Sequence, residues 1–162
     1  MPNFELLFSA QLTNVKEILP PNTDTDWFIK VLCTNCGEIH EKFVSINSEE
    51  RIPITGSRGA VNMVLKCKFC GRELTSDIVE GSVKPYTSDD SGQLRPIVRF
   101  NCNGLEPVEF SIRDGWRVTS SSINETVFSD VDLSPGEWTD YDDNSGVCLE
   151  IMEIQTQFKL TK

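Results

Sequence analysis

Two copies of one short cysteine motif constrain this chain more than any other feature. They are Cys33-Thr34-Asn35-Cys36-Gly37 and Cys67-Lys68-Phe69-Cys70-Gly71. Each motif places two thiols three positions apart, and the glycine that follows lets the chain turn away at positive φ. Together the two turns supply four thiolates, which is the tetrahedral ligand set of a structural Zn²⁺ ion. The 30 residues between the pairs are no obstacle, because loop-closure entropy grows only logarithmically with loop length.

We therefore predict one structural zinc ion, held by Cys33, Cys36, Cys67 and Cys70. The alternatives are a pair of disulfides or two redox-active motifs. A thioredoxin-like redox motif opens a helix, whereas both motifs here follow strand-like runs and neither precedes a helical pattern. An enzyme is not expected, because two complete pairs close the coordination sphere and leave no position for a water molecule. The only histidine, His40, is expected at the surface or beside the site rather than as a catalytic base.

Alternating apolar and polar residues predict an all-β, mainly antiparallel fold. No segment shows a sustained helical stripe. The expected strands are Phe4–Leu12, Trp27–Cys33, Val98–Cys102 and Cys148–Leu160. In the last strand we expect Met152, Ile154, Phe158 and Leu160 on one face. Turns are predicted at the clusters Pro20–Asn22, Ser88–Gly92 and Asp142–Gly146.

Two pairs of segments are similar to each other, which suggests an internal duplication. Ile29–Cys33 matches the pattern of Val98–Cys102, and Glu41–Ser45 resembles Pro107–Ser111. The interpretation is two similar halves of long antiparallel strands that pack as one unit. Residues 1–83 would carry the zinc knuckles, and residues 84–162 would lack them. The alternative is chance similarity between amphipathic strands.

The charge of the chain indicates which classes of partner it can bind. The formal net charge of −10 disfavours nucleic-acid binding, because the neutralisation of phosphates needs a basic surface. A small basic cluster surrounds the motifs all the same: Arg51, Arg58, Lys66, Lys68 and Arg72. An acidic surface suits a basic protein partner or simply solubility.

The cysteines and the missing targeting signals predict the cellular compartment of the protein. No apolar run approaches the ~20 residues of a membrane span, and the first residues do not resemble a secretory signal. Six cysteines without such a signal are expected as reduced thiols in the cytosol or nucleus.

Three further features are weaker candidates for function. The segment Gly56-Ser57-Arg58-Gly59 could cradle an anion, but it lacks the Lys-Ser/Thr ending of a phosphate loop and a β-turn is favoured. Cys102 and Cys148 are expected as metal-free core thiols, and a second, softer metal site or a redox pair is the alternative. The segment Trp138–Asp143 combines aromatic and acidic residues, and it is either a solvated loop or a docking surface.

Taken together, these motifs resemble the eukaryotic family of CxxC-motif-containing zinc-binding proteins, formerly catalogued as a domain of unknown function. The resemblance covers essentially the whole chain. Besides the two cysteine motifs it rests on these segments: Trp27-Phe28-Ile29-Lys30, Gly56–Gly59, Lys84-Pro85-Tyr86, Gly104–Val108, Phe128-Ser129-Asp130 and Trp138–Asp142.

The resemblance implies two similar all-β halves and one zinc ion in the N-terminal half, bound by the four cysteines named above. It also implies a cytosolic binding protein. Members of the family are linked to the biogenesis of translation elongation factor 1A and, separately, to a copper chaperone. We therefore expect a non-enzymatic protein-binding module or dedicated chaperone; a metal-trafficking protein that passes zinc or copper to a partner is the alternative.

Overall fold

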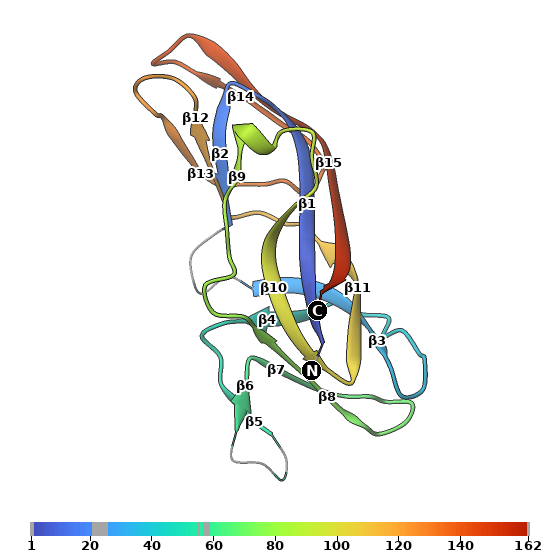
Figure 1. Cartoon of the computed structure of the whole chain (residues 1–162). Helices are drawn as coiled ribbons and strands as arrows, with labels where there is room; N and C mark the ends of the chain where they lie inside the picture. Colours follow the sequence, from blue (N-terminus) through green and yellow to red (C-terminus); the bar gives the residue numbers. More distant parts are fainter. Residues whose placement is uncertain (1, 21–25, 55, 57–58, 162) are drawn as a thin grey trace.

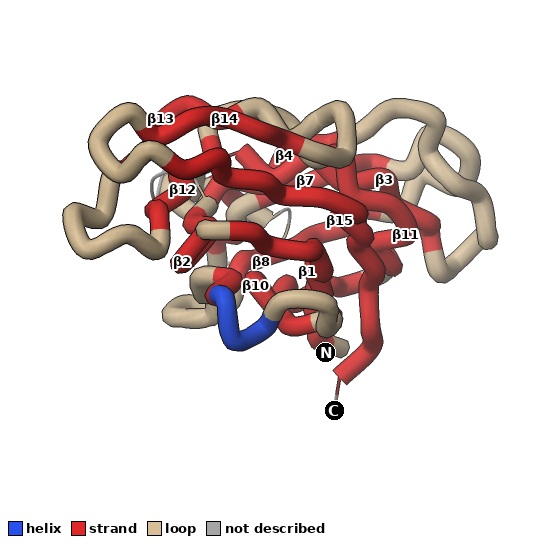
Figure 2. Tube along the Cα trace, turned by 90° about the horizontal axis from the view of Figure 1, so that it is seen from above, coloured by secondary structure: helices blue, strands red, loops and turns tan. Residues whose placement is uncertain are grey.

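The chain folds into antiparallel β-sheets in a computed structural model that describes residues 2–20, 26–54, 56 and 59–161 (Figure 1). Within these residues the only helix is a short 3-10 turn, η1 (Ser88–Asp90), which lies in the predicted turn cluster Ser88–Gly92. No described helix has the length and apolar composition of a membrane-spanning segment. Figure 2 shows the same dominance of strands from a second direction, so the predicted all-β fold is confirmed.

The largest sheet contains six strands, and each strand pairs with its neighbours in antiparallel fashion. Across the sheet the order is β14 (Trp138–Asp142), β15 (Val147–Thr161), β1 (Asn3–Thr13), β10 (Arg95–Asn103), β8 (Glu73–Ile78) and β7 (Met63–Lys66). The long strands β1, β10 and β15 run through the middle of the molecule (Figure 1). They provide the frame to which the other sheets attach.

Two smaller sheets lie toward opposite ends of these long strands (Figure 1). One sheet consists of β11 (Leu105–Ser111), β3 (Asp26–Cys33) and β4 (Val44–Asn47). The other consists of β13 (Val127–Val131), β12 (Trp116–Ser120), β2 (Val15–Leu19) and β9 (Tyr86–Thr87). A two-stranded ribbon is formed by β5 (Ile52–Pro53) and β6 (Ala60–Val61).

The strands form where the sequence alternates, because alternate side chains of a strand point to opposite faces. In β1 the buried residues are Phe4, Leu6, Phe8 and Ala10. In β3 they are Trp27, Ile29, Val31 and Cys33. All four strands predicted from alternation are present, and each is included in β1, β3, β10 or β15.

The predicted face of β15 is wrong in part, because the strand contains a bulge. Leu149 and Ile151 are fully buried at one end, whereas Ile154 and Phe158 pack against the core further along. The switch from odd to even positions coincides with the register shift between Ser9 and Gln11 of β1. Near this shift, the backbone of Glu153 has a φ of +54°. An extra residue in a strand reverses which side chains face inward, so the inward-facing positions are odd before the bulge and even after it. Leu160 shares the parity of Ile154 and Phe158 but lies near the end of the strand, where it is 59% exposed.

An aromatic cluster joins the three larger sheets at the centre of the core. Trp27 of β3 packs edge-on against Trp116 of β12, with ring centroids 6.4 Å apart, and against Phe100 of β10 at 6.2 Å. Phe8 of β1 stacks on Trp116 at 6.0 Å and meets Tyr86 edge-on at 5.0 Å. Aromatic pairs in these arrangements add to the stability that burial alone gives.

The internal duplication is not confirmed. The two best-matched segments lie in β3 and β10, which belong to different sheets and have different neighbours: β11 and β4 flank β3, while β1 and β8 flank β10. All three larger sheets also combine strands from both sides of residue 83. The division into residues 1–83 and 84–162 therefore stays a prediction.

Candidate metal centre

The first cysteine motif is a tight turn at the end of β3. Cys33 is the last residue of the strand, and its backbone N–H donates to the carbonyl of Glu38 at 2.9 Å. The N–H of Gly37 donates back to the carbonyl of Cys33 at 2.8 Å. Gly37 has a φ of +78°, in the left-handed region that residues with a Cβ atom avoid. The turn thus needs glycine at this position for its backbone conformation.

The second motif repeats this geometry between β7 and β8. The N–H of Cys67 donates to the carbonyl of Arg72 at 2.8 Å, and the N–H of Gly71 donates to the carbonyl of Cys67 at 2.7 Å. The φ of Gly71 is again +78°. Two sequence motifs of identical spacing have therefore folded into two equivalent knuckles, and neither one opens a helix.

The two knuckles face each other and bring the four predicted ligands together. The sulfur atoms of Cys33, Cys36, Cys67 and Cys70 all lie within 4.8 Å of one another. Across the two motifs, Sγ of Cys33 lies 3.7 Å from Sγ of Cys70, and Sγ of Cys36 lies 3.7 Å from Sγ of Cys67. Four sulfurs placed tetrahedrally around zinc at about 2.3 Å would be about 3.8 Å apart. The four cysteines are therefore positioned to hold one metal ion, and their geometry fits zinc.

Each motif contributes one buried and one exposed cysteine. Cys33 and Cys67 are buried, whereas Cys36 and Cys70 are exposed. The first cysteine of each pair lies at or directly after the end of a strand, on the side of the turn that faces the core. The second cysteine lies on the side of the turn that faces solvent. One side of the sulfur cluster consequently faces the core and the other faces solvent.

The two exposed thiols also differ in acidity. The side chain of Asn35 and the backbone N–H of Arg72 donate to Cys70 and lower its pKa to about 6. The backbone N–H of Glu38 acts in the same direction on Cys36, but desolvation and the neighbouring thiols outweigh it and raise the pKa of Cys36 to about 12. Four adjacent thiols cannot all ionise unless a cation balances their charge. Zinc supplies that charge when bound, and it binds the thiolate form.

The cluster lies between two sheets. Cys33 belongs to the three-stranded sheet, while the Cys67–Gly71 knuckle connects two strands of the six-stranded sheet. A metal held by all four sulfurs cross-links these two sheets. The first knuckle is also fixed from the side, because the N–H of Thr34 donates to the carbonyl of Gly104 at 3.0 Å.

His40 lies beside the second knuckle, as one of the sequence alternatives expected, but it is buried. Only 7% of its surface is exposed, and Nε2 has no hydrogen-bond partner among the described residues. The imidazole ring contacts the ring of Phe69 edge-on, with centroids 6.3 Å apart. Phe69 itself is 53% exposed at the tip of the knuckle. His40 thus packs under the aromatic side chain of Phe69.

Four of the five residues in the predicted basic cluster lie on the described surface, and all four are exposed: Arg51, Lys66, Lys68 and Arg72. The last three lie in or beside the second knuckle. Arg58 lies outside the described residues, as do Ser57 and the turn residues Pro21 and Asn22. The turns predicted at Gly56–Gly59 and Pro20–Asn22 therefore stay predictions.

The two remaining cysteines have different environments. Cys102 is fully buried, as predicted; burial raises its pKa to about 11, and Oγ of Ser76 lies 3.6 Å from its sulfur. Cys148 is exposed, so the prediction of a core thiol is wrong there. It lies opposite Tyr141 of the edge strand β14, and its neighbour Leu149 takes the inward position. Neither thiol belongs to the metal cluster.

The aromatic and acidic segment Trp138–Asp143 divides into buried and exposed parts. Trp138 packs edge-on against Phe128 with centroids 5.5 Å apart, whereas Tyr141 is 51% exposed. Asp142 is buried and accepts hydrogen bonds from Oγ1 of Thr126 at 3.1 Å, from the N–H of Asn144 at 3.0 Å and from Oγ of Ser145 at 2.7 Å. These donors hold its pKa below the usual value, since the Ser145 hydroxyl favours the carboxylate. Asp142 is thus a structural residue.

Sequence reasoning missed Asn62, which joins three segments of the chain. Its side-chain amide donates to the carbonyls of Ser48 and Glu50, and its Oδ1 accepts from the N–H of Ile78 at 2.8 Å. Its own N–H donates to Asp77. A single asparagine between Val61 and Met63 carries no signal for this role, because alternation alone places it at the surface.

Comparisons with known proteins agree with the site. A model of the eukaryotic family described as CXXC motif containing zinc binding protein matches residues 5–159. A protein of that name from Xenopus laevis is 37% identical over 158 residues, which cover 98% of both chains. The crystal structure of C1orf123 superposes with a TM-score of 0.92 at 36% identity, over 98% of this chain and 99% of that one. A hypothetical protein from Plasmodium falciparum shares the fold, with a TM-score of 0.86 at 20% identity over 99% and 100% of the two chains. The chain belongs to the eukaryotic family of CXXC motif containing zinc binding proteins.

Proposed function

We propose that this protein is a non-enzymatic, zinc-stabilised binding protein whose partner is another protein. The observation that carries the proposal is the set of four sulfurs around one point. A catalytic zinc keeps one position for water, whereas four thiolates occupy every tetrahedral position. The buried His40 supports the same proposal, because a general base must reach the proton that it removes.

The proposed binding surface lies where the β14–β15 turn meets the loop between β12 and β13, and we call it the acidic end. Its exposed apolar side chains are Ile123, Val127 and Tyr141, of which Ile123 is fully exposed. The hydrogen bond from Thr126 to Asp142 ties the loop to the turn, and Figure 1 shows the two side by side. Exposed apolar side chains are candidates for contact with a partner when they form a contiguous patch.

The charge around this surface favours a basic partner. Residues 84–162 contain 14 acidic and 7 basic side chains, so most of the net charge of −10 lies in this part of the sequence. Asp140 and Asp143 are exposed on either side of the turn's buried Asp142. Complementary charge raises the rate of association, while a partly buried aromatic side chain supplies affinity. By family resemblance we propose translation elongation factor 1A as the client, bound during its biogenesis in the cytosol.

The test measures binding of purified elongation factor 1A by biolayer interferometry. We expect Tyr141→Ala to accelerate dissociation about tenfold, as the loss of an interface anchor does. The double substitution Asp140→Asn, Asp143→Asn should slow association and flatten its dependence on salt. The matched control is Glu106→Gln with Asp114→Asn, which removes two exposed charges elsewhere. Unchanged kinetics in both acidic-end variants would rule out this surface as the interface.

A second candidate function is the transfer of zinc or copper to a partner. The exposure of Cys36 and Cys70 favours it, because an acceptor thiol could reach these sulfurs without unfolding the protein. The two functions differ in metal lability. A structural site retains zinc against a chelator of moderate affinity, whereas a transfer site exchanges isotopically labelled zinc while the protein stays folded.

A further inference from the structure

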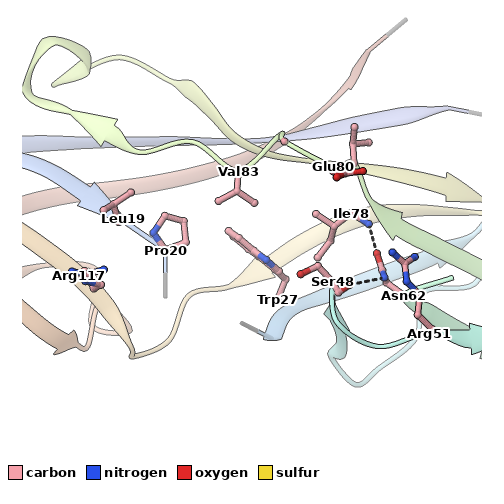
Figure 3. A pocket seen from close by; sticks show the side chains of 12 residues that line it. Leu19, Pro20, Trp27, Ser48, Arg51, Asn62, Ile78, Glu80, Val83 and Arg117 are labelled. Atoms are coloured by element: carbon pink, nitrogen blue, oxygen red, sulfur yellow. Dashed lines mark hydrogen bonds between the residues drawn. The ribbon is translucent and has the colours of Figure 1, made fainter. Parts of the chain in front are cut away.

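A groove lies between the end of β2, the start of β3 and the end of β8, away from the four cysteines. Its volume is about 820 Å³, in the range of sites that bind ligands. Figure 3 shows Arg117 near Leu19 and Pro20 at one end, and Arg51 near Ser48 and Asn62 at the other. Trp27 and Val83 lie between the two ends.

The floor of the groove is apolar and rests on a packed aromatic cluster. Trp27 is only 3% exposed, and three aromatic neighbours hold its indole ring: Phe100, Phe110 and Trp116. Ile78 and Val83 add aliphatic surface beside it. Because Trp27 is buried, an apolar side chain placed here would mainly contact Val83, which is exposed, and Ile78, which is half-buried.

One wall of the groove is fixed by hydrogen bonds. Asn62 lines the groove, but both ends of its amide are already used, because it donates to the carbonyls of Ser48 and Glu50 and accepts from Ile78 (Figure 3). Asn62 therefore stabilises the wall of the groove rather than binding an occupant. A preformed wall lowers the conformational cost of binding.

The charges at the two ends select the occupant. Arg51 and Arg117 are exposed, and neither guanidinium forms an ion pair within the described part of the chain. The described ion pairs engage other cations: Lys16, Lys30, Arg95 and Arg99. Glu80 is the one acidic residue among those lining the groove. Two arginines at opposite ends of an apolar floor are unusual in a protein of net charge −10, and each can bind a carboxylate with two hydrogen bonds.

We propose that this groove binds an acidic peptide segment of a partner protein, with an apolar side chain against Val83 and Ile78 and carboxylates at Arg51 and Arg117. A nucleic acid fits less well, since backbone recognition needs a longer basic stripe. This site differs in position and charge preference from the acidic end, so the two can engage different segments, and neither depends on the other being correct.

The experiment uses the full chain with zinc bound and a peptide that carries fluorescein on its N-terminal amine, fluorescein-Asp-Glu-Leu-Phe-Glu-Asp-amide, followed by fluorescence anisotropy. Arg51→Gln and Arg117→Gln should each weaken binding about fivefold, as loss of one exposed ion pair does, and the double variant should weaken it by about the product. Val83→Trp places a larger side chain in the middle of the groove and should weaken binding by obstructing the apolar contact. Arg95→Gln, an exposed arginine outside the groove, is the matched control.

Two peptide controls separate charge from apolar contact. Replacing Leu-Phe by Ala-Ala should weaken binding about tenfold or more, because the buried apolar side chains are lost. Replacing the acidic residues by lysine should abolish binding. The proposal is overturned if the wild-type protein shows no saturable binding of the acidic peptide, if the arginine double variant or Val83→Trp binds it unchanged, or if the lysine peptide binds equally well. It is overturned in favour of nucleic acid if oligouridylate binds and displaces the peptide in an arginine-dependent way.

Discussion

Replacement of Gly37 by alanine tests the knuckle geometry most directly. A Cβ atom at this position would meet no atom within 4 Å, so steric contact contributes nothing. The whole cost comes from φ, which is +78° and lies where an L-residue loses about 1–2 kcal/mol. For a chain of this size that corresponds to a fall in melting temperature of about 2–8 °C. If the turn relaxes when zinc is released, zinc affinity should fall about 5- to 30-fold by the same free energy.

The assay combines thermal unfolding with zinc competition against a chromophoric chelator. Gly37→Asn should recover part of the loss, because asparagine tolerates the left-handed conformation better than alanine does. Gly136→Ala is the matched control: its φ is +85° and its Cβ would also meet no atom within 4 Å, but it lies far from the cysteines in the sequence. The control should lower the melting temperature without a change in zinc affinity. Wild-type stability and zinc affinity in Gly37→Ala would refute the argument that φ dictates glycine in the knuckle.

Three further predictions concern the other cysteines and the buried carboxylate. Cys67→Ser should reduce bound zinc below one ion per chain and lower the melting temperature, because zinc contributes ~10–16 kcal/mol in small thiolate sites. Full zinc content by mass spectrometry would contradict the ligand assignment. The Cys102→Ala, Cys148→Ala double variant should still bind one zinc ion, and the buried Cys102 should account for most of any stability lost; a lower metal stoichiometry would show that these thiols take part in metal binding. Asp142→Ala should cost about 1–3 kcal/mol at neutral pH, because it removes the buried acceptor of three part-buried hydrogen bonds, from Thr126, Asn144 and Ser145. The pKa of Asp142 is lowered in the folded protein, so its charge stabilises the fold at pH values above the ordinary aspartate pKa of about 3.9. This contribution is lost as the pH falls through the lowered pKa. The difference in unfolding free energy between the wild type and Asp142→Ala should therefore shrink in acid.

The parts of this structure that the sequence predicts are those set by local spacing. A CxxCG motif specifies its own turn. The four ligands could therefore be named without knowing the fold, although the two motifs lie 34 residues apart in the sequence. Strand positions followed from alternation for the same reason. Sheet membership did not follow, because it depends on pairing between distant segments: nothing local shows that β3 lies beside β11 whereas β10 lies beside β1.

The predictions that were wrong, and the residue that was overlooked, also have specific physical causes. The bulge near Glu153 shifted the inward positions of β15, and a period-two reading has no way to detect one extra residue. Cys148 was placed in the core for the same reason. Asn62 was overlooked because its importance lies in three hydrogen-bonded segments that meet only in the folded chain.

Zinc and the groove are joined by shared strands, which leads to a last prediction. β3 carries Trp27 near its start and Cys33 at its end, about 20 Å apart in an extended strand. β8 begins just after the second knuckle and ends at Ile78, whose N–H donates to Asn62. Removal of zinc releases the cross-link between the two sheets that contain these strands, so the floor and wall of the groove should lose their fixed relation.

We therefore expect chelation of zinc to weaken binding of the acidic peptide and to increase hydrogen exchange at Ile78 and in β3, while the β12–β13 pair at the other end exchanges as before. Re-addition of zinc should restore both. Ser76, Thr75 and Leu74 of β8 are buried between these two points and offer a continuous packed route for the effect. Peptide affinity that is unchanged after verified zinc removal would show that the groove keeps its shape without the metal, and that the zinc ion stabilises only the knuckles themselves.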